Sequence, residues 1–508
     1  MAMGMRTQKS VNMSEDLTQA IAPYATALHD KLLHYHCSSC FRNIPTQSPS
    51  AMSCTTCCSV QYCCSDCLIS DCEVHLSSGE CCFFVNHLRE ASSSYLTEET
   101  SDIRAALQLL YFLEIHGLLS SDSINNSSRI GGLSASGIKE VLEEGEEIAE
   151  RMLEGSLLML SARKLRMQIT VGHSNELTIE RVALWAVMTN SVEVQISEGQ
   201  ALGIAVYGPS FSWFNHSCCP NASYRFVLST RNEDCTSDKP ESYVVPVSKG
   251  AAPDAWHACP YQEDGSIHAQ CKYGPRVVVR CTKPINNGDE VFITYIDLLQ
   301  IREARLSDLW SKYKFVCSCN RCTALPKPYV DLILNCDARN LNSPEDAVTG
   351  PAIEDLDNVI QQAISEYSFG GDPKSCCDII ETKRDSVQYH QFRSTCEKFG
   401  RHMLSLSLQC WPFLAQSLAC LEKIKNPIEF SWLGPAVLQS VQLSEEDFAK
   451  LSCTHGPSVL IEGQKDCILS LAVCCITYSK YLAGICYGPK HYLADRAKDL
   501  LECINLVQ

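Results

Sequence analysis

Cysteine and histidine residues are concentrated near the start of the chain in spacings that suit metal ions. Two Cys-x2-Cys pairs are followed by a Cys-x3-Cys pair, one histidine and one more cysteine. Zn²⁺ takes four thiolate or imidazole ligands in a tetrahedron, so eight such ligands make two closed, structural sites. A segment this short has little core of its own, and metal binding would supply its folding energy. The eight residues are Cys37, Cys40, Cys54, Cys57, Cys63, Cys67, His75 and Cys81.

Three further segments between residues 211 and 322 contain residues that could bind a ligand or take part in a reaction. The sequence NHSCCPN at 215–221 follows an aromatic run, GDEVFITY occupies 288–295, and FVCSCNRC occupies 315–322. Each has a plain structural explanation when taken alone: a turn with a core histidine, a strand aromatic, and three thiolates that need a fourth ligand. Their combination and order therefore carry the functional information.

Composition indicates a soluble intracellular protein of roughly three domains. The chain has 508 residues, of which 45% are hydrophobic and 20% charged, and no basic-then-apolar leader opens it. Its 32 cysteines suit metal binding in a reducing compartment better than disulfides. The most apolar stretch, Cys467 to Tyr478, is too short to cross a bilayer and predicts a buried helix. We expect a monomer in the nucleus and cytoplasm, without membrane contact.

The net charge of −17 bears on the partners of the protein. It is an ordinary value for an acidic intracellular protein, and it also describes a surface that repels nucleic acid and attracts basic peptides. Few basic residues lie between 37 and 81, which argues against phosphate binding there. We therefore expect protein partners and no direct contact with nucleic acid.

The elements around these residues change in kind along the chain. Helices are expected at 103–115, with Ser101 and Asp102 as caps, and at 138–153 and 178–188. Residues 120–137 read as a loop, and 230–274 as a long polar insertion. Short strands are expected in VEVQI, YRFVL, RVVVRC and EVFITYI between 192 and 296, and helices from 324 onward.

The first cluster resembles the MYND zinc finger. In that family the two sites interleave, so the resemblance assigns Cys37, Cys40, Cys63 and Cys67 to one ion and Cys54, Cys57, His75 and Cys81 to the other. His75 and Cys81 are five residues apart where the family usually has three, which leaves Cys72 and Cys82 as alternatives for the last ligand. MYND fingers typically dock proline-containing peptides, and we expect the same partners here.

The later segments, in this order, resemble a SET domain with its post-SET zinc site, and the chain resembles the SET-and-MYND protein-lysine methyltransferases. The resemblance implies an α+β fold in which a SET β fold with a pseudoknot is interrupted by the finger and a helical insertion. An all-α, tetratricopeptide-like domain follows it. It also implies a third zinc ion, held by Cys218, Cys317, Cys319 and Cys322.

The implied activity is methyl transfer from S-adenosylmethionine to a lysine of a histone tail or another basic protein segment. The amine must be neutral to attack, and a dry apolar channel lowers its pKa. Tyr295 matches the catalytic tyrosine of the channel, and it also belongs to the cofactor site. The other cofactor positions implied by the resemblance are Gly4, Asn190, Ser212, Phe214, Asn215, His216 and Phe315.

The resemblance also implies a division of the chain into segments. The sequence departs from the family pattern at two places. Gly4 matches the last glycine of an RGxGL loop whose earlier part is missing, so a catalytically weak or inactive scaffold is the alternative function. The insertion carries Cys235, His257, Cys259, His268 and Cys271, whose irregular spacing predicts a loop rather than a fourth metal site. The expected segments are 1–36 (start of the SET domain), 37–82 (finger), 83–190 (helical insertion), 191–300 (SET core), 301–323 (post-SET) and 324–508 (helical domain).

Overall fold

The computed structural model shows a mixed α/β protein with two compact units. It describes residues 3–45, 48–90, 99–119, 129–144, 146–167, 178–197, 199, 201–228, 242–248, 274–325, 327–328, 330–331, 334, 395, 398–412, 414, 417–418 and 468–507. The first unit comprises Met1–His216, Ala222–Ile293 and Asp308–Val316. The second comprises Ser217–Asn221, Thr294–Ser307 and Cys317–Gln508.

A four-stranded sheet in the first unit joins segments that are far apart in the sequence. Its order is β11-β1-β13-β9, and β9 runs parallel to β13, so that Asn215 lies opposite Phe292 and His216 opposite Ile293. The other strands of the sheet pair antiparallel. The bounds are β1 (Met3–Thr7), β9 (Asn215–His216), β11 (Val244–Ser248) and β13 (Glu290–Ile293).

Two smaller sheets and two short hairpins, β3 (Met52–Ser53) with β4 (Gln61–Tyr62) and β5 (Arg129–Ile130) with β6 (Leu133–Ser134), complete the described β part of the first unit. One of the two sheets pairs β10 (Ala222–Leu228) with β12 (Pro275–Cys281), and the chain between residues 11 and 21 runs along β12 through isolated bridges. The other has the order β2-β8-β7, with β2 at Pro23–Leu28, β8 at Gly203–Tyr207 and β7 at Ser191–Glu193. The three consecutive valines of β12, Val277, Val278 and Val279, are all buried, so both faces of the strand are covered at this point.

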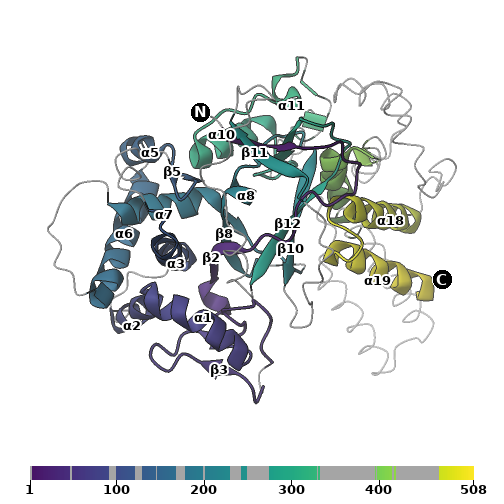
Figure 1. Ribbon diagram of the computed structural model, residues 1–508. Helices are drawn as coiled ribbons and strands as arrows, with labels where there is room; N and C mark the ends of the chain where they lie inside the picture. Colours follow the sequence, from purple (N-terminus) through teal and green to yellow (C-terminus); the bar gives the residue numbers. More distant parts are fainter. Residues whose placement is uncertain are drawn as a thin grey trace, which may run out of the picture. The chain divides into compact units, whose positions relative to one another are not determined.

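Helix α3 (Ser101–Ile115) lies at the centre of the helical part of the first unit (Figure 1). Every residue from Ile103 to Leu113 is buried, because β2 and β8 cover one side and helices cover the others. A helix that is apolar nearly all round is stable only in such an enclosed position. The helices that contact it are α1 (Ser65–Ser77), α2 (Glu80–Glu90), α6 (Glu146–Met167) and α7 (Ile179–Asn190).

The described part of the second unit is mainly helical. Helix α11 (Asn320–Thr323) is short, residues 398–410 are helical, and α18 (Ile468–Cys486) packs beside α19 (Tyr492–Val507), as Figure 1 shows. Helix α10 (Arg302–Tyr313) begins in this unit. No helix among the described residues is both long enough and apolar enough to span a membrane. The helices expected from residue 324 onward are confirmed at 398–410, in α18 and in α19, whereas most of residues 326–467 lies outside the described part of the chain.

Several expected elements differ from the observed ones. The loop expected at 120–137 includes a hairpin, β5 (Arg129–Ile130) and β6 (Leu133–Ser134), and the polar insertion includes β11. The helix expected at 138–153 is two helices, α5 (Ile138–Glu144) and α6. Helix α3 begins at Ser101 with Thr100 as its cap residue, one position before the expected caps. Short strands stabilised by distant partners leave little local signal, which explains the missed β5, β6 and β11.

Candidate metal centres and cofactor site

The first metal centre is formed by four cysteines of the finger. Cys37 and Cys40 flank a turn near the start of the finger, whereas Cys63 and Cys67 follow β4 (Gln61–Tyr62) and begin α1. Their four sulfurs all lie within 4.8 Å of one another, with Cys63 Sγ at 3.7 Å from Cys40 and 3.6 Å from Cys67. A zinc–sulfur bond of 2.3 Å in a tetrahedron places neighbouring sulfurs about 3.8 Å apart. The geometry therefore fits zinc.

The second centre includes Cys81 and neither of the two alternatives for the last ligand of the finger. Cys54, Cys57, His75 and Cys81 are all buried and their ligand atoms lie within 4.8 Å of one another. Cys81 Sγ is 3.8 Å from Cys54 Sγ, and His75 Nε2 is 3.4 Å from Cys57 Sγ. The alternatives are outside this group: Cys82 is half-buried, and Cys72 contacts a backbone carbonyl of its own helix. Burial raises the pKa of Cys57, but the hydrogen bonds with His75, Ser59 and Cys54 and the charge of His75 together lower it to about 6.

The third centre lies in the second unit. Cys218 approaches three cysteines of the segment around α11, namely Cys317, Cys319 and Cys322, with all ligand atoms within 4.8 Å. The sulfurs of Cys218 and Cys322 are 3.5 Å apart although 104 residues separate them in the sequence. This approach provides the fourth ligand that the Cys-x-Cys-x2-Cys spacing lacks.

A buried cluster of charges lies directly behind the third centre. Arg305 and Arg321 both contact the Asp331 carboxylate, at 2.8 Å and 2.6 Å, and all three side chains are buried. Arg321 also donates to the Leu298 carbonyl at 3.0 Å, and so connects the cysteine segment to the chain just after Tyr295. Burial alone would raise the pKa of Asp331, but the two arginines hold it below its ordinary value. Four thiolates around Zn²⁺ carry an excess of negative charge, which the arginines offset.

Gly4 and Asn215, both expected at the cofactor, come together in the four-stranded sheet. A side chain at Gly4 would place its Cβ at 3.0 Å from Asn215 Nδ2 and at 2.7 Å from Glu290 Oε1. Asn215 donates to the same Glu290 oxygen at 2.7 Å. Glycine at position 4 is thus needed for the close approach of β1 to this pair.

The remaining expected cofactor residues of the first unit lie on neighbouring elements. The ring of His216 is 6.1 Å from that of the half-buried Phe315, measured between centroids. Phe214 is fully buried and packs near Phe211, so it belongs to the hydrophobic core next to the NHSCCPN segment. The Oγ atom of Ser212 is buried and has no hydrogen-bond partner among the described residues. A buried hydroxyl without a partner costs about 1–3 kcal/mol, so this atom fits a ligand contact.

Asn190 is held by the hairpin that sequence reasoning missed. Its side-chain amide donates to the carbonyls of Ser134 and Ala186, each at 2.8 Å. Trp213, between Ser212 and Phe214, donates to the Gly132 carbonyl of the same hairpin at 2.9 Å. The hairpin thereby fixes the end of α7 and the segment before β9 in one place.

Tyr295 belongs to the second unit and is half-buried. It follows the last residue of β13, Ile293, by two positions, and Ile293 lies opposite His216 in the sheet.

Glu290 is the site residue that sequence reasoning did not select. Its signal was present, because it stands between a glycine turn and a buried strand in GDEVFITY.

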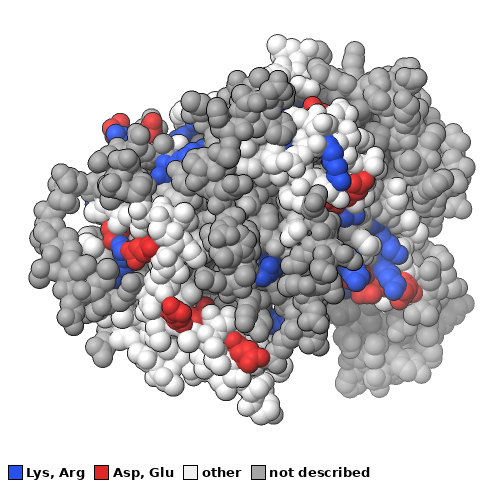
Figure 2. All heavy atoms as spheres, in the orientation of Figure 1, with Lys and Arg blue, Asp and Glu red and all other residues white. Residues whose placement is uncertain are grey.

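The charged side chains visible in Figure 2 are interspersed by sign over the described surface. No continuous patch of Lys and Arg covers the described part of the face shown.

Comparison with known proteins gives matches to a SET domain group protein and to lysine methyltransferases. The chain is 32% identical over 403 residues to Protein SET DOMAIN GROUP 41 of Arabidopsis thaliana, covering 76% of this chain and 62% of that protein. It is 27% identical over 229 residues to N-lysine methyltransferase SMYD2 of Mus musculus and 26% identical over 229 residues to that of Homo sapiens. Each of these two matches covers 45% of this chain and 40% of the relative. The chain thus spans less than two thirds of the relatives' length. No family model matches it.

Proposed function

Because the chain belongs to the SET-domain family that includes the SET-and-MYND lysine methyltransferases, we propose that it transfers methyl groups from S-adenosylmethionine to lysine side chains of proteins. One arrangement carries the proposal. Asn215 and His216 lie on β9, directly beside β13, and the chain reaches Tyr295 two residues after β13 ends. Two of the segments that resemble the family, NHSCCPN and GDEVFITY, are thus adjacent through this pair of strands.

The cofactor would be held by residues of the first unit. S-adenosylmethionine supplies a methyl group that is already activated by the positive charge of its sulfur. Gly4 lets the backbone of β1 come close, Asn215 and His216 offer backbone and side-chain groups from β9, and Ser212 offers its unpaired hydroxyl. Phe315 and Asn190 lie on the elements that adjoin these residues.

The second requirement of the reaction is to orient the substrate lysine toward the methyl group. The family resemblance gives Tyr295 the role of orienting the amine toward the methyl group. Since the substrate lysine must be neutral, burial of its side chain in an apolar channel would lower its pKa. Positioning of the two reactants then provides most of the acceleration.

Zinc completes the proposed architecture. We assign one ion to each of the three centres, with structural roles, because every centre has four protein ligands and none is left for water. The parallel β9–β13 pairing is compatible with the pseudoknot that the family resemblance implies, and the helices after residue 323 with a tetratricopeptide-like domain.

The substrate we propose is a basic, lysine-containing segment of a histone tail or another protein. The net charge of −17 favours such a partner over nucleic acid. The finger is proposed to bind proline-containing peptides, again by resemblance.

Isothermal titration calorimetry with S-adenosylmethionine tests whether the chain is built for catalysis or is a scaffold. The zinc-loaded full-length protein is expected to bind one cofactor per chain, and Tyr295→Phe is expected to bind it similarly, since the hydroxyl acts on the amine. Asn215→Ala should weaken binding by about tenfold through loss of a polar contact near 1.4 kcal/mol. If the zinc-loaded protein binds no cofactor, the scaffold function replaces the enzyme.

A further inference from the structure

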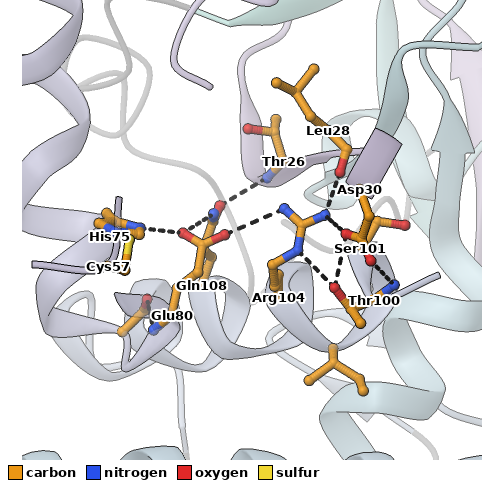
Figure 3. A network of polar contacts seen from close by, with 12 residues as sticks. Thr26, Leu28, Asp30, Cys57, His75, Glu80, Thr100, Ser101, Arg104 and Gln108 are labelled. Carbon is orange, nitrogen blue, oxygen red and sulfur yellow. Dashed lines mark hydrogen bonds and ion pairs between the residues drawn. The ribbon is translucent and has the colours of Figure 1, made fainter. Parts of the chain in front are cut away.

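A buried chain of polar contacts leads from the second metal centre into the core of the first unit. Figure 3 shows Glu80 between His75 of the finger and Arg104 of helix α3. The Nδ1 atom of His75 lies 2.9 Å from Glu80 Oε2, and Nη1 of Arg104 lies 3.6 Å from Glu80 Oε1. The exposed fractions of the Glu80 and Arg104 side chains are only 4% and 1%.

Arg104 extends the chain of contacts to strand β2 and the turn after it. Its Nη2 atom donates to the Leu28 carbonyl at the end of β2 and to the Asp30 carboxylate, the latter at 2.6 Å (Figure 3). The Gln108 side chain donates to Glu80 at 3.1 Å, and its oxygen accepts from the backbone of Thr26 in β2 at 3.1 Å. Glu80 therefore connects the histidine ligand with α3 and β2 by two routes.

The unusual ligand spacing of the finger provides Glu80. It stands immediately before Cys81, in the stretch of five residues between the last two ligands, where three are usual in MYND fingers. Gly79, with φ of +96°, turns the chain there, and Glu80 becomes the first residue of α2. The longer stretch thus brings a carboxylate to the free nitrogen of the metal-binding imidazole.

The energetics of buried charges make these contacts interdependent. A buried carboxylate or guanidinium is tolerated only when it is paired and hydrogen-bonded, and removing one partner costs about 3–5 kcal/mol. A carboxylate on the second nitrogen of a metal-binding histidine fixes its tautomer and orientation, and loss of such a partner lowers metal affinity about 10- to 100-fold.

We propose that Glu80 positions His75 for the second zinc ion and, through Arg104, couples occupancy of that site to the packing of α3 against β2. Zinc at this centre then stabilises the core of the first unit as well as the finger. Conversely, disturbing the contacts of Arg104 loosens the zinc ion. The ordering of α3 and β2 becomes dependent on zinc.

Zinc release from the full-length protein, followed with a chromophoric chelator, tests the first half of the proposal. In Glu80→Gln one of the zinc ions is expected to leave at least about tenfold faster than in the wild type, with the others unchanged. Asp30→Asn, at the far and more exposed end of the chain of contacts, should accelerate the same ion to a smaller extent. The matched control is Asp102→Asn, which removes an ion pair of α3 with Arg151 that involves neither Arg104 nor Glu80.

Hydrogen exchange tests the second half. Removal of zinc from the wild type should increase amide exchange in residues 23–28 and 101–108, which lie outside the finger. The zinc-loaded Asp30→Asn and Glu80→Gln proteins should show part of this increase, and Asp102→Asn none. Unchanged zinc release in both variants, or exchange in these two segments that is independent of zinc, would overturn the proposal. If Glu80→Gln does not fold, Asp30→Asn alone decides by the same two criteria.

Discussion

Asn215 on β9 donates a hydrogen bond of 2.7 Å to Glu290 at the first position of β13. This contact joins two segments separated by 75 residues at the place where the chain resembles the SET family most closely. Gly4 of β1 lies against the pair, so a Cβ at this position would approach both side chains to 3.0 Å or less. The three residues together form the best-defined part of the proposed cofactor site.

A methyl group at position 4 should therefore disturb cofactor binding more than folding. In Gly4→Ala the added Cβ would lie 2.7 Å from Glu290 Oε1, so the carboxylate must move and its hydrogen bond with Asn215 is lost. We expect a stability loss of about 1 kcal/mol and clearly weaker binding of S-adenosylmethionine by calorimetry. Gly484→Ala is the matched control, because its Cβ would meet nothing within 4 Å. Equal cofactor affinity in both variants would contradict the role of Gly4.

Substitution of two adjacent cysteines of the finger should have different effects on the zinc content of the protein. Cys81 is buried within the second centre, whereas its neighbour Cys82 is half-buried outside it. Elemental analysis is expected to give about two zinc ions per chain for Cys81→Ala and three for Cys82→Ala. The opposite pattern would return the last ligand to Cys82.

The third centre predicts that a residue of the NHSCCPN segment is needed to hold the cysteine segment around α11. Cys218→Ala leaves Cys317, Cys319 and Cys322 with an open coordination position. We expect elemental analysis to show one zinc ion fewer and a melting temperature several degrees lower. Retention of three zinc ions in this variant would remove Cys218 from the centre, and Cys219→Ala serves as the adjacent control.

The charge cluster behind the third centre should contribute strongly to stability. Asp331→Asn leaves Arg305 and Arg321 buried without their carboxylate, and we expect a loss of about 3–5 kcal/mol in denaturant unfolding. The folded-state pKa of Asp331 is depressed, so its stabilisation is present above the unfolded-state pKa of about 4 and is lost below it. The loss should accordingly be the same at pH 8 and pH 5. A difference that disappears already at pH 5 would contradict the pairing.

Local spacing made much of this site predictable. The Cys-x2-Cys and Cys-x-Cys-x2-Cys spacings predicted metal ligands, the resemblance to the SET-and-MYND family implied which of them share a site, and the structure groups them in that way. The helix expected at 178–188 and the strand expected in RVVVRC were predictable for the same reason, since their determinants lie within a few residues.

Contacts between distant segments could not be predicted from the sequence. Strand β11 forms because β1 lies beside it, and Arg104 is buried in α3 because Glu80 and Asp30 pair with it. Taken alone, an arginine within an apolar helix and a glutamate beside a cysteine carry no sign of such partners. The choice between Cys81 and Cys82 likewise needed the three-dimensional grouping.

Transfer of labelled methyl groups tests the central claim most directly. Zinc-loaded full-length protein is incubated with labelled S-adenosylmethionine and mixed histones, and modified lysines are located by mass spectrometry. The account predicts label on lysine with the wild type and a rate lower by about a hundredfold with Tyr295→Phe, as for loss of one catalytic hydrogen-bond donor. Absence of label on any lysine, or equal transfer by the wild type and Tyr295→Phe, would contradict it.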